Sequence, residues 1–295
     1  MFLSKIGIKD LTLKNIPQQF IKLPTHLFSC LELKHLKLHY CIFRPSHSYC
    51  GFPNLLSLKL NAVRFQDYQC GELIAQCPLL EVLKITNHET GCEVKLAEIA
   101  KLENLKKLSL WLSLLDKTTM IRSPTIFEQI CLLLPKLEGL SLDYRNCKLL
   151  EEAGAKSLSP VFPYLKTLNL YRMDFFSAIT VSSAIGMIFG SPNLQTLKIT
   201  AAYENAAQPT AICSSEVDYN TIVKTRLRTV VLTSIRGSVN DLCLIKSLLA
   251  GSPLLKKIVI SARPSEMYGG ERGFTTKLLK LHRASPIAEI DLTWL

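Results

Sequence analysis

The sequence lacks the short motifs that mark most catalytic and metal sites. None of its ten cysteines forms a C-x-x-C pair, so the sequence contains no zinc-finger template. It contains no P-loop, H-E-x-x-H, G-x-S-x-G or EF-hand pattern. No visible spacing brings a nucleophile, a base and an orienting acid together. We therefore expect the chain not to be an enzyme, and we expect no metal and no cofactor.

Signals for export and for membrane insertion are also missing. The start, Met1 to Lys5, carries a charge and no apolar h-region, and no Asn-x-Ser/Thr sequon occurs. The one long uncharged run, residues 175–197, contains Gly and Pro, and its apolar part is shorter than the roughly 20 residues of a membrane span. We expect free thiols, no membrane partner, and a location in the cytoplasm and/or nucleus.

Positive charge exceeds negative charge, but it is not concentrated in one run. The chain of 295 residues has 35 Lys and Arg against 24 Asp and Glu, a net charge of +11. The first 60 residues hold eight basic and two acidic side chains, the middle is balanced, and the last 69 hold ten and five. No stretch has four consecutive basic residues, so we expect no nucleic-acid partner.

A repeated pattern organises the chain from end to end. Leu-x-x-Leu-x-Leu, with Ile or Val allowed, occurs eleven times at intervals of 22 to 33 residues. The copies begin at Ile8, Leu33, Leu55, Leu80, Leu105, Leu137, Leu165, Leu194, Leu227, Leu255 and Ile287. The last two apolar positions of each copy lie two residues apart, which predicts a short strand with both side chains on one face.

The remainder of each repeat must return the chain to the start of the next strand. Helix-like apolar spacing occurs in residues 124–134, 178–189, 241–249 and 275–282. In six copies a Pro stands two residues before the first Leu, where it stops a helix. The sequence predicts an α/β leucine-rich-repeat solenoid, or horseshoe, of about eleven repeats, with a concave parallel β-sheet and convex helices.

Three local features are less regular. In leucine-rich repeats the ninth position is usually Asn or Cys, but here only Cys41 follows that rule. This predicts an irregular row of ninth-position side chains inside the solenoid. Residues 200–226 are polar and predict a surface loop. Residues 269–273, Gly-Gly-Glu-Arg-Gly, predict a flexible turn rather than a phosphate cradle, because they lack the Lys-Ser/Thr of a P-loop.

Both ends of the chain resemble a plant family. Residues 23–30, 36–41, 51–55 and 77–83 are similar to the first repeats of plant F-box/LRR-repeat proteins. The runs at 227–230, 241–257 and 278–286 are similar to the FBD region that closes many of them. The resemblance implies leucine-rich repeats over 1–226 and FBD-like repeats over 227–295 that continue the solenoid.

The same resemblance implies a function. Family members carry an N-terminal F-box that docks on the Skp1 adaptor of a cullin-based ubiquitin ligase, and from the resemblance we expect this chain to start after the point where that module would be. We therefore expect the substrate-recognition part of an SCF-type E3 receptor, with a Skp1-type adaptor as partner only if an F-box precedes this chain. A truncated product and a ligase-uncoupled decoy both stay open.

The concave face is the expected binding surface, because solenoids present extended faces there. The candidate partner-binding residues are His35, Lys37, His39, Lys59, Lys84, Lys107, Trp111, Tyr144 and Tyr171. Three lysines on adjacent strands predict a ladder that holds an acidic segment of a target protein, with an apolar group against the exposed aromatics Trp111 and Tyr171. The other interpretation, in which the lysines only solubilise the surface and Trp111 packs on its neighbour, is equally compatible with the sequence.

Other ligands and roles are open at this point. The basic face suits a small anionic ligand such as an inositol phosphate, if Arg and Lys converge in a closed pocket. His35, His39 and Cys41 lie near one another in sequence, but we expect surface histidines rather than a metal site. The repeats of an intracellular immune receptor are a further alternative, against which the FBD-like end speaks.

Overall fold

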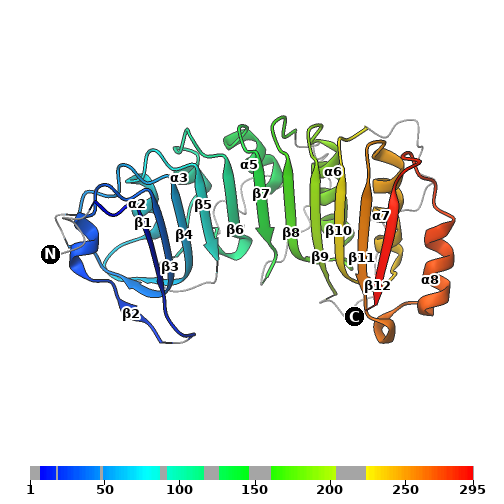
Figure 1. Ribbon diagram of the computed structural model, residues 1–295, viewed down its shortest axis with the longest axis horizontal. Coiled ribbons are helices and arrows are strands. Elements are labelled where there is room, and N and C mark those ends of the chain that lie inside the picture. Colours follow the sequence, from blue (N-terminus) through cyan, green and yellow to red (C-terminus); the bar gives the residue numbers. More distant parts are fainter. Residues whose placement is uncertain are drawn as a thin grey trace. The chain divides into compact units, whose positions relative to one another are not determined.

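The computed structural model describes residues 7–17, 19–46, 49–86, 92–115, 126–145, 161–203 and 224–294. The chain divides into two compact units, Met1–Leu137 and Glu138–Leu295. Each unit contains a parallel sheet with helices on one side (Figure 1). The sheet side that turns away from the helices is called the open face below.

The sheet of the first unit has the order β1-β3-β4-β5-β6, and β2 also pairs with β3. Its strands are β1 (Asp10–Lys14), β2 (Ile21–Lys22), β3 (His35–Phe43), β4 (Ser57–Phe65), β5 (Val82–Thr86) and β6 (Lys107–Trp111). Its helices are short: η1 (Thr25–Ser29), α2 (Cys70–Ala75), α3 (Leu96–Ile99), η2 (Leu112–Leu114) and α5 (Ile126–Leu133).

The sheet of the second unit follows chain order from β7 to β12. Its strands are β7 (Gly139–Asp143), β8 (Thr167–Asp174), β9 (Thr196–Ala202), β10 (Thr229–Ile235), β11 (Lys257–Ala262) and β12 (Glu289–Trp294). Its helices are α6 (Ala178–Phe189), α7 (Val239–Gly251), η3 (Pro264–Glu266) and α8 (Gly270–Leu279). The division of the chain at 226/227 stays a prediction; β9 and β10, which stand on either side of it, are paired in parallel.

The repeat pattern places the strands correctly. Each of the eleven copies has its last two apolar residues on a strand, and every pairing that the structure describes is parallel. These residues form the core: in β3, for example, Leu36 and Leu38 are almost completely buried. The prediction of an α/β leucine-rich-repeat solenoid is confirmed. The two-residue strand β2 was not expected, because no copy of the motif marks it.

The helix predictions are confirmed with shifted ends. Helix α6 has the expected limits, and α5 and α7 overlap the predicted ranges. Helix α8 begins at Gly270, so residues 270–273 are its first turn and the predicted flexible turn is wrong there. Of the predicted loop 200–226, residues 204–223 lie outside the described part. No helix among the described residues is long and apolar enough to cross a membrane.

Backbone kinks explain the ninth position of the repeat. Two residues after the third apolar position, four copies have a residue other than Gly with positive φ, namely Tyr40, Ala62, Arg172 and Ser234. The left-handed residue turns the chain, so the next residue points into the core: Cys41, Val63, Met173 and Ile235 are all buried. These repeats therefore fill the ninth position with small or apolar side chains instead of a polar ladder.

Four cysteines in the described part have free thiols that are buried: Cys30, Cys41, Cys70 and Cys77. Cys243 is disulfide-bonded, so the expectation of free thiols is wrong at that position.

Candidate interaction surface

The three predicted lysines form a ladder in register. Lys37 on β3 lies opposite Lys59 on β4, and Lys59 lies opposite Lys84 on β5. The flanking core residues point toward the helices, so the lysines between them point to the open face. Lys59 and Lys84 are exposed and Lys37 is half-buried. We name Lys37, Lys59 and Lys84 the lysine ladder.

The lowered pKa of His39 reflects the positive potential beside the lysine ladder. It lies on β3 opposite Lys14 of β1 and Asn61 of β4. Partial burial lowers the pKa of His39, and the charges of Lys37, Lys14 and Lys84 lower it further. Three lysines, on β1, β3 and β5, therefore add positive potential at a histidine that favours its neutral form.

The lysine ladder has no acidic partner within the described residues, in contrast to other lysines in the same two sheets. Lys106 pairs with Glu81 at 2.9 Å, Lys166 with Glu138 at 2.8 Å and Lys257 with Asp291 at 3.0 Å. Each of these pairs joins neighbouring repeats. The ladder is therefore a place where like charges stack and no described acidic side chain compensates them.

Two other predicted residues lie at the amino-terminal edge of the same strands. His35 is exposed, and its Nδ1 lies 2.5 Å from Oδ1 of Asp10 on β1. Lys107 is also exposed, and it lies opposite Val82 at the start of β6. The pair of His35 and Asp10 makes this edge less basic than the ladder.

The expected exposure of Trp111 and Tyr144 is wrong. Trp111 is 9% exposed and Tyr144 is 4% exposed. Both stand where a strand stops: Trp111 is followed at once by the buried leucines of η2, and Tyr144 follows the last residue of β7. The alternation of inward and outward side chains ends with the strand, so a pattern extended past it misplaces them.

Tyr171 alone among the predicted aromatics is exposed, at 39%. It lies opposite Asp143 on β7, and its carbonyl oxygen accepts from the Tyr144 N–H at 3.0 Å. Asp143 is buried and forms a two-pronged ion pair with Arg172. The charges next to Tyr171 are thus compensated within the second unit.

A metal site at His35, His39 and Cys41 is not formed. His35 and His39 point to the open face, whereas Cys41 is completely buried after the left-handed residue Tyr40. Among the residues that the structure describes, no group of three or more His, Cys, Asp and Glu is placed to hold a metal ion.

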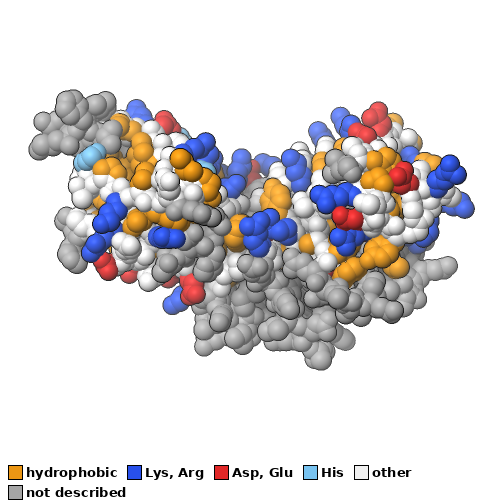
Figure 2. Space-filling view, turned by 90° about the horizontal axis from the view of Figure 1, so that it is seen from below, with side chains coloured by type: hydrophobic (Ala, Val, Ile, Leu, Met, Phe, Trp, Pro, Cys, Tyr) orange, Lys and Arg blue, Asp and Glu red, His pale blue; other side chains and the backbone are white. Residues whose placement is uncertain are grey.

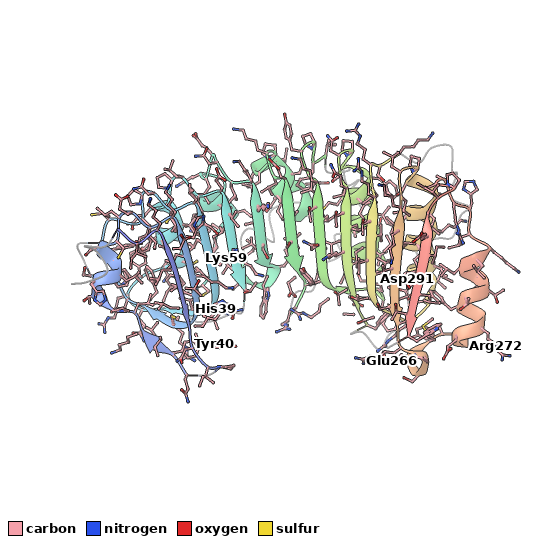
Figure 3. The ribbon with its side chains drawn as sticks, viewed as in Figure 1. His39, Tyr40, Lys59, Glu266, Arg272 and Asp291 are labelled. Carbon is pink, nitrogen blue, oxygen red and sulfur yellow. The ribbon has the colours of Figure 1, made fainter. Side chains whose placement is uncertain are left out.

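An aromatic cluster adjoins the ladder, and the motif search did not find it. The rings of Phe20 and Tyr40 meet edge to face with centroids 5.8 Å apart, and the Arg64 guanidinium lies 3.6 Å from the Phe20 centroid. Phe20 precedes β2, which no copy of the repeat marks. Tyr40 reaches the open face through its positive φ, which the sequence pattern does not reveal. Figure 3 shows Tyr40 next to His39, with Lys59 farther up the sheet.

Comparison with known proteins identifies the type of repeat. A family model described as "FBD-associated F-box protein At5g56370, LRR repeats" matches residues 2–138. The F-box/FBD/LRR-repeat protein At1g13570 of Arabidopsis thaliana is 27% identical over 98% of this chain and 74% of its own length. The chain is similar to plant F-box/FBD/LRR-repeat proteins. A second Arabidopsis relative, F-box/FBD/LRR-repeat protein At1g80470, is 34% identical over 60% of this chain and 32% of its own length.

This similarity indicates a protein-interaction module of the F-box-protein type. In an F-box/FBD/LRR-repeat protein the repeats are the extended part, and their open strands carry the side chains available to a partner. The lysine ladder and Tyr40 of the aromatic cluster lie on such strands, in the region that the family model covers.

Proposed function

We propose that the chain is the substrate-recognition part of an SCF-type ubiquitin ligase receptor and binds an acidic segment of a target protein along the lysine ladder. The observation that carries the proposal is the register of Lys37, Lys59 and Lys84, which stack without an acidic partner in the described part of the chain. We propose further that it acts in the cytoplasm and/or nucleus.

Electrostatics favours an anionic partner at this place. Neighbouring strands are about 4.8 Å apart, and two unit charges about 4 Å apart in water repel by about 1 kcal/mol. Carboxylates laid across the ladder would replace that repulsion by attraction. Lys59 and Lys84 are exposed on open strands, a setting that suits a protein segment better than a small anion enclosed in a pocket.

Charge reversal of the ladder tests the proposal. We expect the variant with Lys37→Glu, Lys59→Glu and Lys84→Glu to lose at least about tenfold in affinity for target, because each reversal turns an attraction into a repulsion. The measurement is capture of proteins from plant extract by the tagged chain, identification of the enriched protein, and titration of that purified protein against both chains.

A matched control separates the ladder from overall charge. Lys95, Lys101 and Lys136 are exposed lysines of the same unit that lie outside the strands of the ladder, so reversing them changes the net charge equally. We expect these three substitutions to weaken target binding by less than about threefold, because exposed charges beyond about 10 Å are largely screened. Equal affinity of the ladder variant and the unmodified chain would refute the proposal.

A further inference from the structure

Four large side chains form an exposed apolar corner in the first unit. Ile16 follows β1 and is 64% exposed, and Ile21 on β2 is 41% exposed. Phe20 and Tyr40 are half-buried and complete the group. We name Ile16, Phe20, Ile21 and Tyr40 the apolar corner. In Figure 2, which looks at the end to which the strands point, apolar side chains lie at the surface of the first unit among Lys and Arg side chains.

The backbone presents the Phe20 and Tyr40 rings of the corner on the open face, whereas Ile21, which lies opposite the buried Cys41, is exposed at the edge of the sheet. Strand β2 pairs with β3 at Cys41 and Ile42, which brings the chain after β1 alongside the end of β3. Tyr40 takes a φ of 53°, an uncommon conformation for a bulky residue. This kink sends Cys41 into the core and leaves the Tyr40 ring outside, where it contacts Phe20.

Arg64 makes the corner cationic as well as apolar. Its guanidinium lies over the Phe20 ring at 3.6 Å, in the geometry of a cation–π contact. On β4 the outward residues run from Lys59 through Asn61 to Arg64, and on β3 they run from Lys37 through His39 to Tyr40. The apolar corner is therefore the continuation of the lysine ladder toward the ends of the same two strands.

The lysine ladder and the apolar corner are close enough for one peptide to contact both. Lys37 and Tyr40 are three residues apart on β3, about 10 Å at strand rise. Three or four residues of an extended partner span the same length. Tyr and Arg are the residue types that most often carry binding energy at protein interfaces, and basic side chains around an apolar contact fit an acidic partner.

We propose that the lysine ladder and the apolar corner form one docking surface for a single partner segment, in which acidic side chains lie three to four residues from a large apolar side chain. The inference rests on the proposed function, since it takes the ladder as the site of the acidic segment. It moves the apolar contact of the interface from the buried Trp111 to Tyr40 and its neighbours.

Selection of peptides from a random display library on the full chain tests this surface. We expect enriched sequences that combine two or more acidic residues with Leu, Ile, Phe, Trp or Tyr three to four positions away. Enrichment of acidic residues alone would overturn the inference and leave the proposed function standing. Enrichment of apolar residues alone, or no enrichment, would count against both.

Substitutions in the apolar corner test whether it makes the apolar contact with the peptide. The most enriched peptide is synthesised with a fluorescent label and titrated against the chain carrying Ile16→Ser and Tyr40→Asn. Asn tolerates the positive φ of Tyr40, so the kink is retained. We expect at least about tenfold weaker binding, and no change for the control Leu254→Ser, which alters a 50% exposed leucine of the second unit. Unchanged binding of the double variant, with its circular dichroism intact, would overturn the inference.

Discussion

At the scale of single residues, His39 couples the proposed interface to pH. Burial, followed by the charges of Lys37, Lys14 and Lys84, lowers the pKa of His39 below the ordinary histidine value of 6.5. Asn61, on the other neighbouring strand, is uncharged. The folded chain thus holds this proton less readily than the unfolded chain. The contribution of His39 to stability is fully present above pH 6.5 and declines as the pH falls below that value.

Binding of an acidic segment should reverse this effect. Carboxylates near His39 favour its charged form, so we expect target affinity to rise as the pH is lowered from 7.5 to 5.5. The gain is up to about tenfold for each unit by which the partner raises the pKa of His39. Titrations of the target at several pH values measure it. The variant His39→Gln should bind with a flatter pH profile, and an identical profile would argue against a role for His39.

Sequence reasoning at this scale succeeded where the strand continues and failed where it ends. Lys37, Lys59 and Lys84 lie between two core residues of a strand, so their outward direction follows from the period of two. Trp111 is the last residue of β6 and Tyr144 follows the last residue of β7. Their burial depends on the turn that comes next, and the repeat pattern carries no information about that turn.

At the scale of elements, the start of helix α7 is held by a buried carboxylate. The Ser238 Oγ accepts from the Asp241 N–H, and Asp241 accepts from the Ser238 N–H at 2.8 Å. The Tyr203 hydroxyl donates to the same carboxylate at 2.8 Å. Burial raises the pKa of Asp241, and the hydrogen bonds from Tyr203 and Ser238 oppose that rise. Tyr203 thus links the residue after β9 to the cap of α7.

We expect Tyr203→Phe to destabilise the chain by about 1–3 kcal/mol at pH 7, because a buried carboxylate loses a donor. The raised pKa of Asp241 means that its contribution to stability is fully present below pH 3.8 and is lost as the pH rises through the folded pKa. Loss of the Tyr203 donor raises this pKa further, so the destabilisation should shrink as the pH falls toward 4. Urea unfolding at pH 7 and pH 4 measures both values.

A matched control is available for this substitution. Tyr164→Phe removes the same hydroxyl from a side chain that is 59% exposed, and we expect a change within about 0.5 kcal/mol. A destabilisation by Tyr203→Phe that does not depend on pH would show that Asp241 is not the group through which Tyr203 acts.

Strands that contain a copy of the leucine pattern were predicted correctly, whereas elements between the copies were predicted poorly. The eleven strands follow from the leucine pattern, because each strand places two apolar residues on one face, and these are buried in all but the edge strands β1 and β12. Strand β2 and the start of α8 depend on how the chain packs after a repeat ends. Gly269, with a φ of 76°, precedes α8 directly, so the glycine run that reads as a turn in the sequence becomes the entrance and first turn of a helix.

At the scale of the whole molecule, target binding and ligase recruitment should be separable. We propose that a Skp1-type adaptor binds only when an F-box precedes these residues, and the lysine ladder lies within the repeats. In a chain that carries an F-box ahead of residue 1, we expect reversal of the ladder to abolish target capture and leave adaptor capture unchanged. Pull-down of adaptor and target with the same bait measures both. Parallel loss of the adaptor would contradict separate binding surfaces.

The sequence by itself determined the repeat fold, the resemblance to plant F-box/FBD/LRR-repeat proteins and the lysine ladder, because all three depend on residue identity at regular spacing. The tertiary structure decided which aromatic side chains reach solvent. Tyr40 is outside because of a left-handed kink, and Trp111 is inside because its strand stops. Such backbone turns arise from packing between neighbouring repeats, which no local pattern encodes. The lysine ladder can therefore be predicted from the sequence, whereas the apolar corner can be recognised only in the tertiary structure.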